Sequence, residues 1–468
     1  MKPTQGESKP KELEGQDLDN LDLNTEDFVF EDKKRRQDVL LDKLSEYLMA
    51  KYTFKTLRDT EEILVYDASR GVYRANGETV IKEAMEEVLK ERGLVEQATR
   101  RAVSEVVGHI QRQTCIEREE VNAKSRFINV QSGLLDLKKA LHGEPDALEL
   151  HTNQVVSTIQ LPVKYDPKAT CPRISKFFRE VVAEKDVPLL EEIFGWCLLP
   201  DYRFQRAVLL SGEGSNGKST LINLVKALLG SENCSAVSLQ AASPSNNRFA
   251  TANLYGKLAN LCADLSSATI SDAGALKMLT GGDLIPAEHK FGKPFTFTNR
   301  AKLIFSANRP PQIHDDSLAV WRRVMIIDFP NQFMGKEDDK GLLGKITTQS
   351  ELSGLLNVAI TGLRRLARKK DFSYGRSWEE TKENYIMLSD PLQAFVEECC
   401  VLGVTEGNLE EGPPAIPKEK LYKHYVVYCQ VNKLPPDSKK GFGRHLKAKY
   451  KREVSERKAG WVGIAIKD

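Results

Sequence analysis

The stretch that most constrains this chain is residues 208–225, VLLSGEGSNGKSTLINLV. Apolar residues lead into a loop with three glycines, and a helical pattern follows the loop. From Gly212 to Ser219 the loop fits the spacing G-x4-G-K-S. Such a loop wraps closely round phosphates because its glycines let backbone N–H groups point inward, and the next helix presents its positive end to the same anion. The pattern therefore predicts a nucleoside triphosphate site.

The individual loop residues have distinct expected roles. We expect Lys218 to reach the outer phosphates of ATP and the Ser219 hydroxyl to ligate Mg²⁺. The residues expected to contact the nucleotide are Gly212, Gly214, Ser215, Asn216, Gly217, Lys218, Ser219 and Thr220.

Length and composition narrow the class of protein. A chain of 468 residues is long enough for two to four domains, and its net charge of +2 says nothing about partners. None of the eight cysteines forms a C-x-x-C pair, so we expect reduced thiols and no zinc ribbon. No signal-like segment or long apolar run occurs, so we expect a cytoplasmic protein with no membrane partner.

The pattern divides the chain into four parts. Residues 1–35 form an acidic tail expected to be disordered: nine acidic and no basic residues lie between 12 and 32. The tail is either simply solvated or an arm that mimics DNA or binds a partner. Residues 36–200 predict a mixed domain with a helical collar and no visible active site, with helices near 37–52, 78–92, 96–113, 177–182 and 189–199. Strands are expected within 61–77, 126–137 and 155–167.

Residues 201–385 predict an α/β domain with a parallel sheet, because apolar strands at 207–211, 258–263, 302–307 and 324–329 alternate with helices. Asp264 follows the second strand and suits metal binding or water activation. Asn308 follows the third and suits orientation of the attacking water. Arg322 and Arg323 precede the fourth and suit transition-state charge stabilisation, often from a neighbouring subunit.

We expect these groups to share one edge of the sheet. The alternatives are that Asp264 and Asn308 cap local structure and that the two arginines form surface ion pairs.

Residues 283–299 predict a hairpin, with alternating Phe295 and Phe297 and a turn at Phe291-Gly292. His289, Lys290 and Lys293 cluster at that turn. Lysines there suit the phosphates of single-stranded nucleic acid, and an aromatic ring suits stacking. The alternative is a solvated surface turn.

Residues 386–468 predict a basic winged-helix domain, with helices near 418–432 and 438–452 and two strands within 453–466. Ten basic residues stand against three acidic ones between 433 and 458. The candidates for duplex phosphates are Lys439, Lys440, Arg444, Lys447 and Lys449. The alternatives are a surface that only keeps the domain soluble, or one that docks on the acidic tail.

Taken together, GEGSNGKST, KLANLCADLS, LKMLTGGDLIPAEHKFGKPFTFTNRAKLIFSANRPP and DDSLAVWRRVMIIDFPNQF resemble superfamily 3 helicases. The similarity is to the helicase half of phage and plasmid primase-helicases and their poxvirus relatives. It extends upstream through FINVQSGLLDL and LLEEIFGWCLLPDYRFQRAVLL and covers most of the chain from about residue 60.

The resemblance implies an AAA+-type P-loop ATPase that forms a homo-oligomeric ring, usually a hexamer, with ATP and Mg²⁺ between subunits. It implies Asp264 as the Walker B acid, Asn308 as the sensor, and Arg322 or Arg323 as the arginine finger, with Arg323 favoured. It also places the hairpin in the ring channel on single-stranded nucleic acid. One departure is the Ala263-Asp264 pair, because many members have two adjacent acidic residues; Asp272 is a candidate to assist.

The expected function is an ATP-dependent DNA helicase that moves on single-stranded DNA and unwinds forked duplex during replication of a virus, plasmid or integrated mobile element. One alternative is an ATP-controlled replication initiator or DNA-binding protein without processive unwinding. Another is a scaffold or partner-loading protein with degraded catalysis. Only about sixty residues precede the family-like region, so we expect no primer synthesis from this chain. The chain is either a fragment of a longer primase-helicase or a stand-alone helicase with a separate primase or initiator as partner.

Overall fold

The computed structural model describes residues 33–123, 126–242, 247–265, 270, 273–290, 292–313, 315, 317–335, 338–404, 415–432, 434–458 and 460–467. The acidic tail before residue 33, Asp272 and Phe291 lie outside these residues. The chain divides into two compact units, Met1–Lys124 with Leu150–Ile159, and Ser125–Glu149 with Gln160–Asp468. Residues 160–200 therefore belong to the same unit as residues 201–385.

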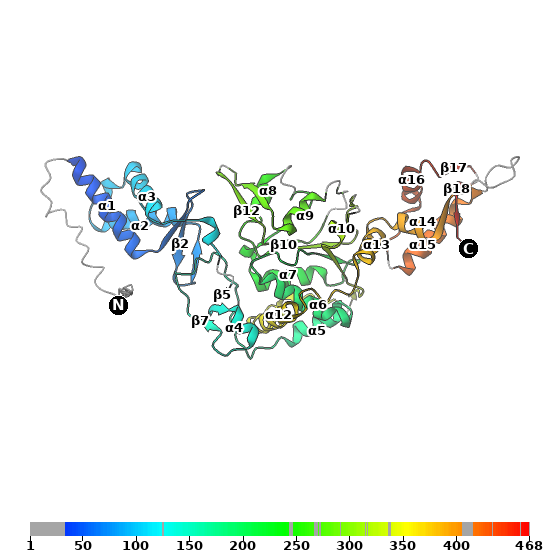
Figure 1. Cartoon of the computed structure of the whole chain (residues 1–468), viewed down its shortest axis with the longest axis horizontal. Coiled ribbons are helices and arrows are strands. Elements are labelled where there is room, and N and C mark those ends of the chain that lie inside the picture. Colours follow the sequence, from blue (N-terminus) through cyan, green and yellow to red (C-terminus); the bar gives the residue numbers. More distant parts are fainter. Residues whose placement is uncertain are drawn as a thin grey trace, which may run out of the picture. The chain divides into compact units, whose positions relative to one another are not determined.

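The first unit packs three helices on a small sheet (Figure 1). Its strands run in the order β3-β2-β1-β4, with β1 antiparallel to β2 and parallel to β4. Leu48, Phe54, Ile81, Met85 and Ile110 are buried between helices and sheet. The elements are α1 (Lys33–Lys51), β1 (Phe54–Leu57), β2 (Ile63–Asp67), β3 (Val72–Arg74), α2 (Gly77–Glu91), α3 (Arg100–Gln113) and β4 (Cys115–Ile116).

The second unit is built round a five-stranded parallel sheet with the order β14-β8-β13-β10-β9. The mixed α/β fold with a parallel sheet, expected from the sequence, is confirmed. Its strands are short and almost wholly buried, as strands covered on both faces are. They are β8 (Ala207–Ser211), β9 (Cys234–Ser235), β10 (Ala259–Cys262), β13 (Lys302–Ala307) and β14 (Val324–Asp328).

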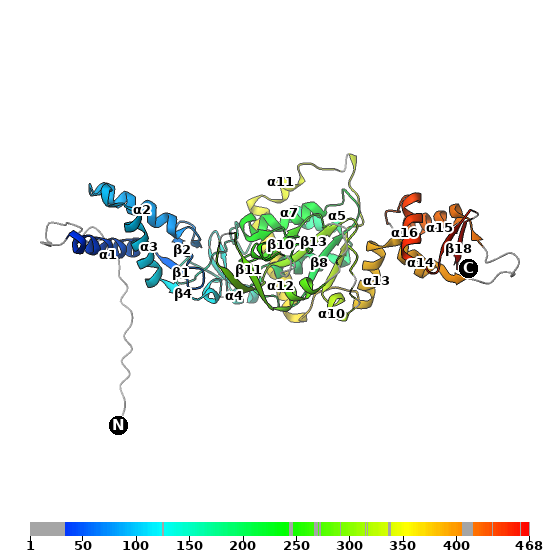
Figure 2. The same ribbon diagram turned by 90° about the horizontal axis from the view of Figure 1, so that it is seen from above.

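Helices cover both sides of this sheet (Figures 1 and 2). On one side, α6 and α7 pack apolar side chains such as Ile193 and Leu221 against Val208 and Ile304 of the sheet. Helix α12 packs closely on α6, and a Cβ at Gly362 would come within 2.2 Å of the Glu191 carbonyl oxygen. The helices of this side are α5 (Pro172–Val181), α6 (Val187–Cys197), α7 (Lys218–Leu229), α11 (Leu342–Ile346) and α12 (Gln349–Lys369).

The opposite side carries α8 (Arg248–Ala252), α9 (Gly274–Gly281) and α10 (Leu318–Trp321), with the hairpin of β11 (Leu284–Glu288) and β12 (Pro294–Thr298). A three-stranded sheet of β5 (Phe127–Val130), β6 (Gly133–Asp136) and β7 (Leu148–Glu149) also belongs to the second unit, with α4 (Leu137–His142). The strand expected within 155–167 is wrong: only one bridge, Leu161 to Val130, forms there among the described residues.

The C-terminal part has a core of its own, in which Phe395, Tyr425, Phe442 and Trp461 are buried together. Strand β18 pairs antiparallel with β15, β16 and β17. The expected two helices followed by two strands are confirmed. The elements are α13 (Trp378–Ser389), α14 (Pro391–Cys399), β15 (Cys400–Val404), β16 (Ala415–Ile416), α15 (Lys418–Val431), α16 (Lys439–Lys449), β17 (Ser455–Arg457) and β18 (Gly460–Ile466).

Two global features complete the picture. All eight cysteines are unpaired, and five of them are buried. Among the described residues, no helix combines the length and the apolar character needed to cross a lipid bilayer.

Candidate nucleotide site and nucleic-acid surfaces

The glycine loop connects β8 to α7, as its sequence predicts. Gly217, the N-cap of α7, has φ +91°, and a Cβ there would meet Val181 Cγ1 at 2.6 Å. Gly212 has φ +147°, and a Cβ there would lie 2.7 Å from the Phe329 carbonyl oxygen. Positive φ at both ends is what only glycine adopts at low cost. These two residues set the curvature of the loop and bring it onto the first turn of α7.

Lys218 lies inside the loop and is only 6% exposed. Its Nζ donates hydrogen bonds to the carbonyl oxygens of Gly212 (2.6 Å) and Glu213 (2.9 Å) and to Asn216 Oδ1 (3.0 Å). Burial lowers the pKa of Lys218 to about 8, because desolvation disfavours the ammonium form. The ammonium therefore lies where the phosphates of a nucleotide would be cradled.

The segment after β14 braces the loop from outside. Buried Asn216 donates from Nδ2 to the Phe329 carbonyl oxygen at 3.3 Å, and the backbone N–H of Phe333 donates to the Ser215 carbonyl oxygen at 2.7 Å. Gln332 Nε2 donates to a carboxylate oxygen of Glu213 at 2.9 Å. Sequence analysis did not find this brace, because no local pattern links residues more than a hundred positions apart.

Three of the loop residues expected at phosphates and metal are accessible. Gly214, Ser215 and Ser219 are exposed, and nothing lies within 4 Å of a Cβ built on Gly214. The Ser219 hydroxyl stands in the first turn of α7, where a helix N-terminus favours anions. A protein hydroxyl, one carboxylate and phosphate oxygens suit Mg²⁺, which keeps several waters and needs few protein ligands. Ser219 and Asp264 therefore fit the ion.

Asp264 and Asn308 lie at the same edge of the sheet as the loop. Ala307, the last residue of β13, pairs with Ser211, the last residue of β8, so Asn308 lies beside Gly212. Cys262, the last residue of β10, pairs with Phe305, and the N–H of Leu265 donates to the Ser306 carbonyl oxygen at 2.9 Å. Both Asp264 and Asn308 are exposed. The carboxyl ends of three neighbouring strands thus present a loop, a carboxylate and an amide together.

Arg322 and Arg323 lie at the opposite edge, and the expectation of one shared edge is wrong for them. They precede β14, whose first residue Val324 pairs with Ala207 at the start of β8. Five residues of strand at ~3.3 Å each separate that end from the loop, or about 16 Å. Neither arginine can therefore line its own chain's loop. Neither makes an ion pair with a described carboxylate, which also disfavours the surface ion-pair interpretation.

The two arginines differ in accessibility. Arg323 is 7% exposed and donates to Thr280 Oγ1 at 3.0 Å and to the Ala319 carbonyl oxygen at 2.5 Å. Burial and the adjacent Arg322 cation lower the pKa of Arg323. Arg322 is exposed and donates from Nη2 to Gln205 Oε1 at 3.0 Å. The geometry therefore favours Arg322 over Arg323 as the residue able to reach a neighbour.

The hairpin forms as expected, with Glu288 opposite Pro294 next to the turn. Phe295 and Phe297 point inward, where they contact the ring of Tyr255 at 5.2 and 5.6 Å. These phenylalanines are therefore core residues of the hairpin and are not available to stack on bases. His289, Lys290 and Lys293 are exposed at the turn, and the imidazole of His289 stacks on Phe295 at 5.5 Å.

The base of this hairpin connects to the arginine pair. Thr280 closes α9, and its hydroxyl accepts the hydrogen bond of Arg323. The hairpin begins four residues later at Leu284. Asn299, just after the hairpin, donates from Nδ2 to the Leu279 carbonyl oxygen at 2.8 Å. Arg323 and Asn299 together fix the end of α9, and this was not foreseen from the sequence.

Helix α16 presents its basic residues unequally. Lys439, Lys440, Arg444 and Lys447 are all exposed. Lys439 pairs with Glu419 at 2.7 Å, and Lys447 pairs with Glu456. Lys449 is held by Asp390 at 2.5 Å and by Gln393 at 2.6 Å. Lys440 and Arg444, one helical turn apart, have no such partner among the described residues and are the better candidates for phosphates.

The loop after Asn308 contacts this C-terminal part. Arg309 donates from Nη1 to Asp437 Oδ1 at 2.8 Å and from Nε to the Ser389 carbonyl oxygen at 3.1 Å. Gln312 Nε2 donates to Asp390 Oδ2 at 2.8 Å. Asp390 also accepts from Lys449, so the α16 lysine and the Asn308 loop share one carboxylate.

Comparisons with known proteins agree with the expected relationship. A family model described as D5 N terminal like matches residues 43–183, and one described as a family of unknown function (DUF5906) matches residues 210–323. The chain is 26% identical over 216 residues to the putative helicase L207/L206 of Acanthamoeba polyphaga mimivirus, covering 44% of this chain and 22% of that protein. It is 29% identical over 142 residues to the putative helicase 121R of Invertebrate iridescent virus 3, covering 28% and 15%.

The matched region is thus about a fifth or less of the length of these curated relatives. Among solved structures, the A form apo structure of the NrS-1 C-terminal region is 14% identical, covers 91% of this chain and 99% of that chain, and has a TM-score of 0.45. The names of the viral relatives suggest a helicase-like function.

Proposed function

We propose that this chain, which is similar over part of its length to viral putative helicases, is the ATP-dependent motor of a DNA helicase of the phage and viral primase-helicase type. The single observation that carries the proposal is the meeting of the glycine loop, Asp264 and Asn308 at the carboxyl ends of β8, β10 and β13. A site that only binds a nucleotide needs the loop alone. A site that hydrolyses the nucleotide also needs groups that orient and activate water, such as a carboxylate and an amide beside the loop.

In the proposed reaction, Lys218 exchanges its three internal hydrogen bonds for oxygens of the β- and γ-phosphates of ATP. The N–H groups at the start of α7 stabilise the same charge. Asn308 orients the attacking water through its amide, and Asp264 accepts a hydrogen bond or proton from that water. Ser219 and Asp264 would hold Mg²⁺, which would neutralise charge on the phosphates when bound.

The arginine pair supports a proposal of assembly. Because Arg322 lies about 16 Å from its own loop, it acts only on the nucleotide of another copy. We assign the arginine finger to Arg322 and place Arg323 as a positioning residue that holds the base of the hairpin. A closed ring of identical copies, such as the AAA+-type hexamer, gives every site one such neighbour.

The nucleic-acid contacts proposed are of two kinds. The turn of the hairpin, with His289, Lys290 and Lys293, is the candidate for single-stranded DNA, held through phosphates without reading sequence. Lys440 and Arg444 of α16, in a domain whose helix-helix-hairpin order supports a winged-helix interpretation, are the candidates for duplex ahead of the fork.

The proposal is tested by ATP turnover and strand displacement on a forked duplex. Lys218→Ala and Asp264→Asn should each reduce DNA-stimulated turnover at least a hundredfold and abolish displacement. Lys226→Ala, an exposed lysine two turns along the same helix, should leave both activities unchanged. Lys290→Ala with Lys293→Ala should keep basal turnover and lose displacement. Turnover that survives Lys218→Ala contradicts the proposal.

A second candidate function is an ATP-controlled initiator that assembles on DNA without unwinding it. The observation that favours it is the single acidic residue of the Ala263-Asp264 pair, where the resembled family often has two. ATP-dependent assembly on duplex DNA, with slow turnover and no strand displacement, distinguishes this function from the helicase.

A further inference from the structure

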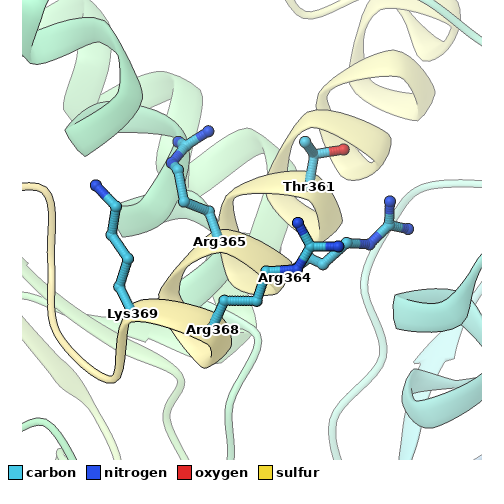
Figure 3. A pocket seen from close by; sticks show the side chains of 5 residues that line it. All are labelled: Thr361, Arg364, Arg365, Arg368 and Lys369. Carbon is cyan, nitrogen blue, oxygen red and sulfur yellow. The ribbon is translucent and has the colours of Figure 1, made fainter.

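A second cationic site lies on α12, away from the sheet edge that carries the glycine loop. The last two turns of the helix bring four basic side chains round a cavity of about 430 Å³ (Figure 3). The cavity is lined by Thr361, Arg364, Arg365, Arg368 and Lys369. No described carboxylate and no aromatic ring lines it.

Only one of the four cations is neutralised. Arg365 pairs with Glu192 at 2.6 Å and with Glu191 at 3.0 Å, and it also donates to the Pro188 carbonyl oxygen. In Figure 3, Arg365 and Lys369 extend to one side of the helix, and Arg364 and Arg368 extend to the other. The local carboxylates are thus taken up by a single arginine.

The other three cations lack a carboxylate partner among the described residues. Arg364 donates from Nη2 to the Ala140 carbonyl oxygen at 3.2 Å, while its Nε is buried with no acceptor. Lys369 donates to Ser373 Oγ at 2.7 Å. Arg368 is exposed, and no hydrogen bond or ion pair involves its side chain in the described chain. Three positive charges therefore surround one open cavity.

The helix dipole alone does not explain this arrangement. Cations at a helix C-terminus are stabilised by the helix dipole, but like charges one turn apart repel by a similar amount. The buried Arg364 Nε, a donor without an acceptor, adds a further cost. An anion in the cavity offsets the repulsion, because it pairs with the guanidinium groups and the ammonium.

We propose that this cavity binds backbone phosphates of single-stranded DNA, as a contact additional to the hairpin and α16. Arg364 and Arg368 are one turn apart, so their side chains are spaced by about 6 Å along the helix axis. That spacing is comparable to the distance between neighbouring phosphates of an extended single strand, so the two guanidinium groups can contact two adjacent phosphates. Guanidinium forks suit phosphate oxygens, and the absence of a ring to hold a base makes the contact independent of sequence.

The inference rests on the proposed role in DNA handling, so its test measures binding without nucleotide. The probe is a labelled thirty-nucleotide oligothymidine, and anisotropy gives its affinity for the full chain between 50 and 200 mM salt. The test variant is Arg368→Glu with Lys369→Glu, because both side chains are exposed and removing them disturbs no buried contact. The matched control is Lys164→Glu with Lys168→Glu, two exposed lysines of the same unit outside the cavity.

The test variant should bind at least tenfold more weakly, and its slope of log affinity against log salt should fall by about 1.4, or ~0.7 for each of two lost phosphates. The control should keep the wild-type slope, and ATP turnover without DNA should be unchanged in both. Equal losses in test and control overturn the proposal. The proposal is also overturned if the test variant keeps its DNA affinity but no longer binds a peptide of residues 12–32. That result would make the cavity a docking site for the acidic segment. Failure of the helicase proposal shows separately, as wild-type turnover that DNA does not stimulate.

Discussion

The pKa of Lys218 leads to a prediction for nucleotide affinity between pH 7 and 9. Burial lowers this pKa from 10.5 to about 8 before nucleotide binds. Bound phosphates raise it, because negative charge favours the ammonium form. Below pH 8 the free chain already carries the proton, so affinity does not depend on pH. Above pH 8 each binding event must take up a proton, and affinity falls about tenfold per pH unit.

The ratio of total free chain to free chain with protonated Lys218 rises from about 1.1 at pH 7 to about 11 at pH 9. The affinity for ATP should therefore weaken about tenfold over this interval, or ~1.4 kcal/mol. The assay is titration with a fluorescent ATP analogue and Mg²⁺ at constant ionic strength. Lys218→Arg is the matched control, because a guanidinium stays charged throughout and its weaker binding should not vary with pH. A wild-type affinity that is flat from pH 7 to 9, or a Lys218→Arg curve parallel to wild type, refutes the reasoning.

Three further predictions follow from named contacts. Lys302 is fully buried and donates to three carbonyl oxygens at 2.7–2.8 Å. Lys302→Met leaves these three carbonyl oxygens without a donor, and removal of the buried charge offsets this loss only in part. The substitution should therefore lower the free energy of unfolding by about 3 kcal/mol, measured as a lower denaturant midpoint. In Gly217→Ala the new Cβ would lie 2.6 Å from Val181, and the backbone at this residue has φ +91°, which alanine rarely adopts. This variant should bind ATP at least tenfold more weakly in the same titration, with a melting temperature within a few degrees of wild type. Mixing Arg322→Ala chains with Lys218→Ala chains should restore part of the ATP turnover, because a mixed ring contains interfaces with an intact lysine on one side and an intact arginine on the other. Mixing Arg323→Gln chains with Lys218→Ala chains should restore turnover but not strand displacement. No restoration in either mixture contradicts an arginine finger supplied by a neighbour.

Local patterns in the sequence predicted the parts of the fold that are decided locally. The bounds expected for β8 and β13 agree with the structure to the residue, and the hairpin at 284–298 forms where alternation indicated. The glycine loop was foreseen in full because strand, loop and helix are consecutive. Residues 155–167 have the alternation of a strand, but their backbone hydrogen bonds are divided between the two units. Val156 and Ser157 accept from Asn122 and Tyr73 of the first unit, whereas Leu161 and Val163 bond to Asn129 and Gln131 of the second, so only Leu161 forms a bridge.

What the sequence did not predict depends on pairing between distant segments. Nothing local states that β13 inserts between β8 and β10, which is what brings Asn308 beside Gly212. The position of Arg322 and Arg323 at the other edge could have been predicted, because residues that precede a strand of a parallel sheet lie at its amino end, as the pairing of Val324 with Ala207 shows. Lys302 reads as an ordinary charged residue at the start of a strand, and only the structure shows its ammonium between the rings of Trp196 and Tyr202.

The adjacency of Arg322 and Arg323 has a mechanical consequence under the proposed assembly. One peptide bond joins the side chain that senses a neighbour's phosphate to the side chain that holds Thr280 at the hairpin base. A displacement of the first is therefore passed to the second without crossing the sheet. The movement of each hairpin would then depend on the nucleotide bound to the adjacent copy, and the hairpins would move in the order in which ATP is hydrolysed round the ring.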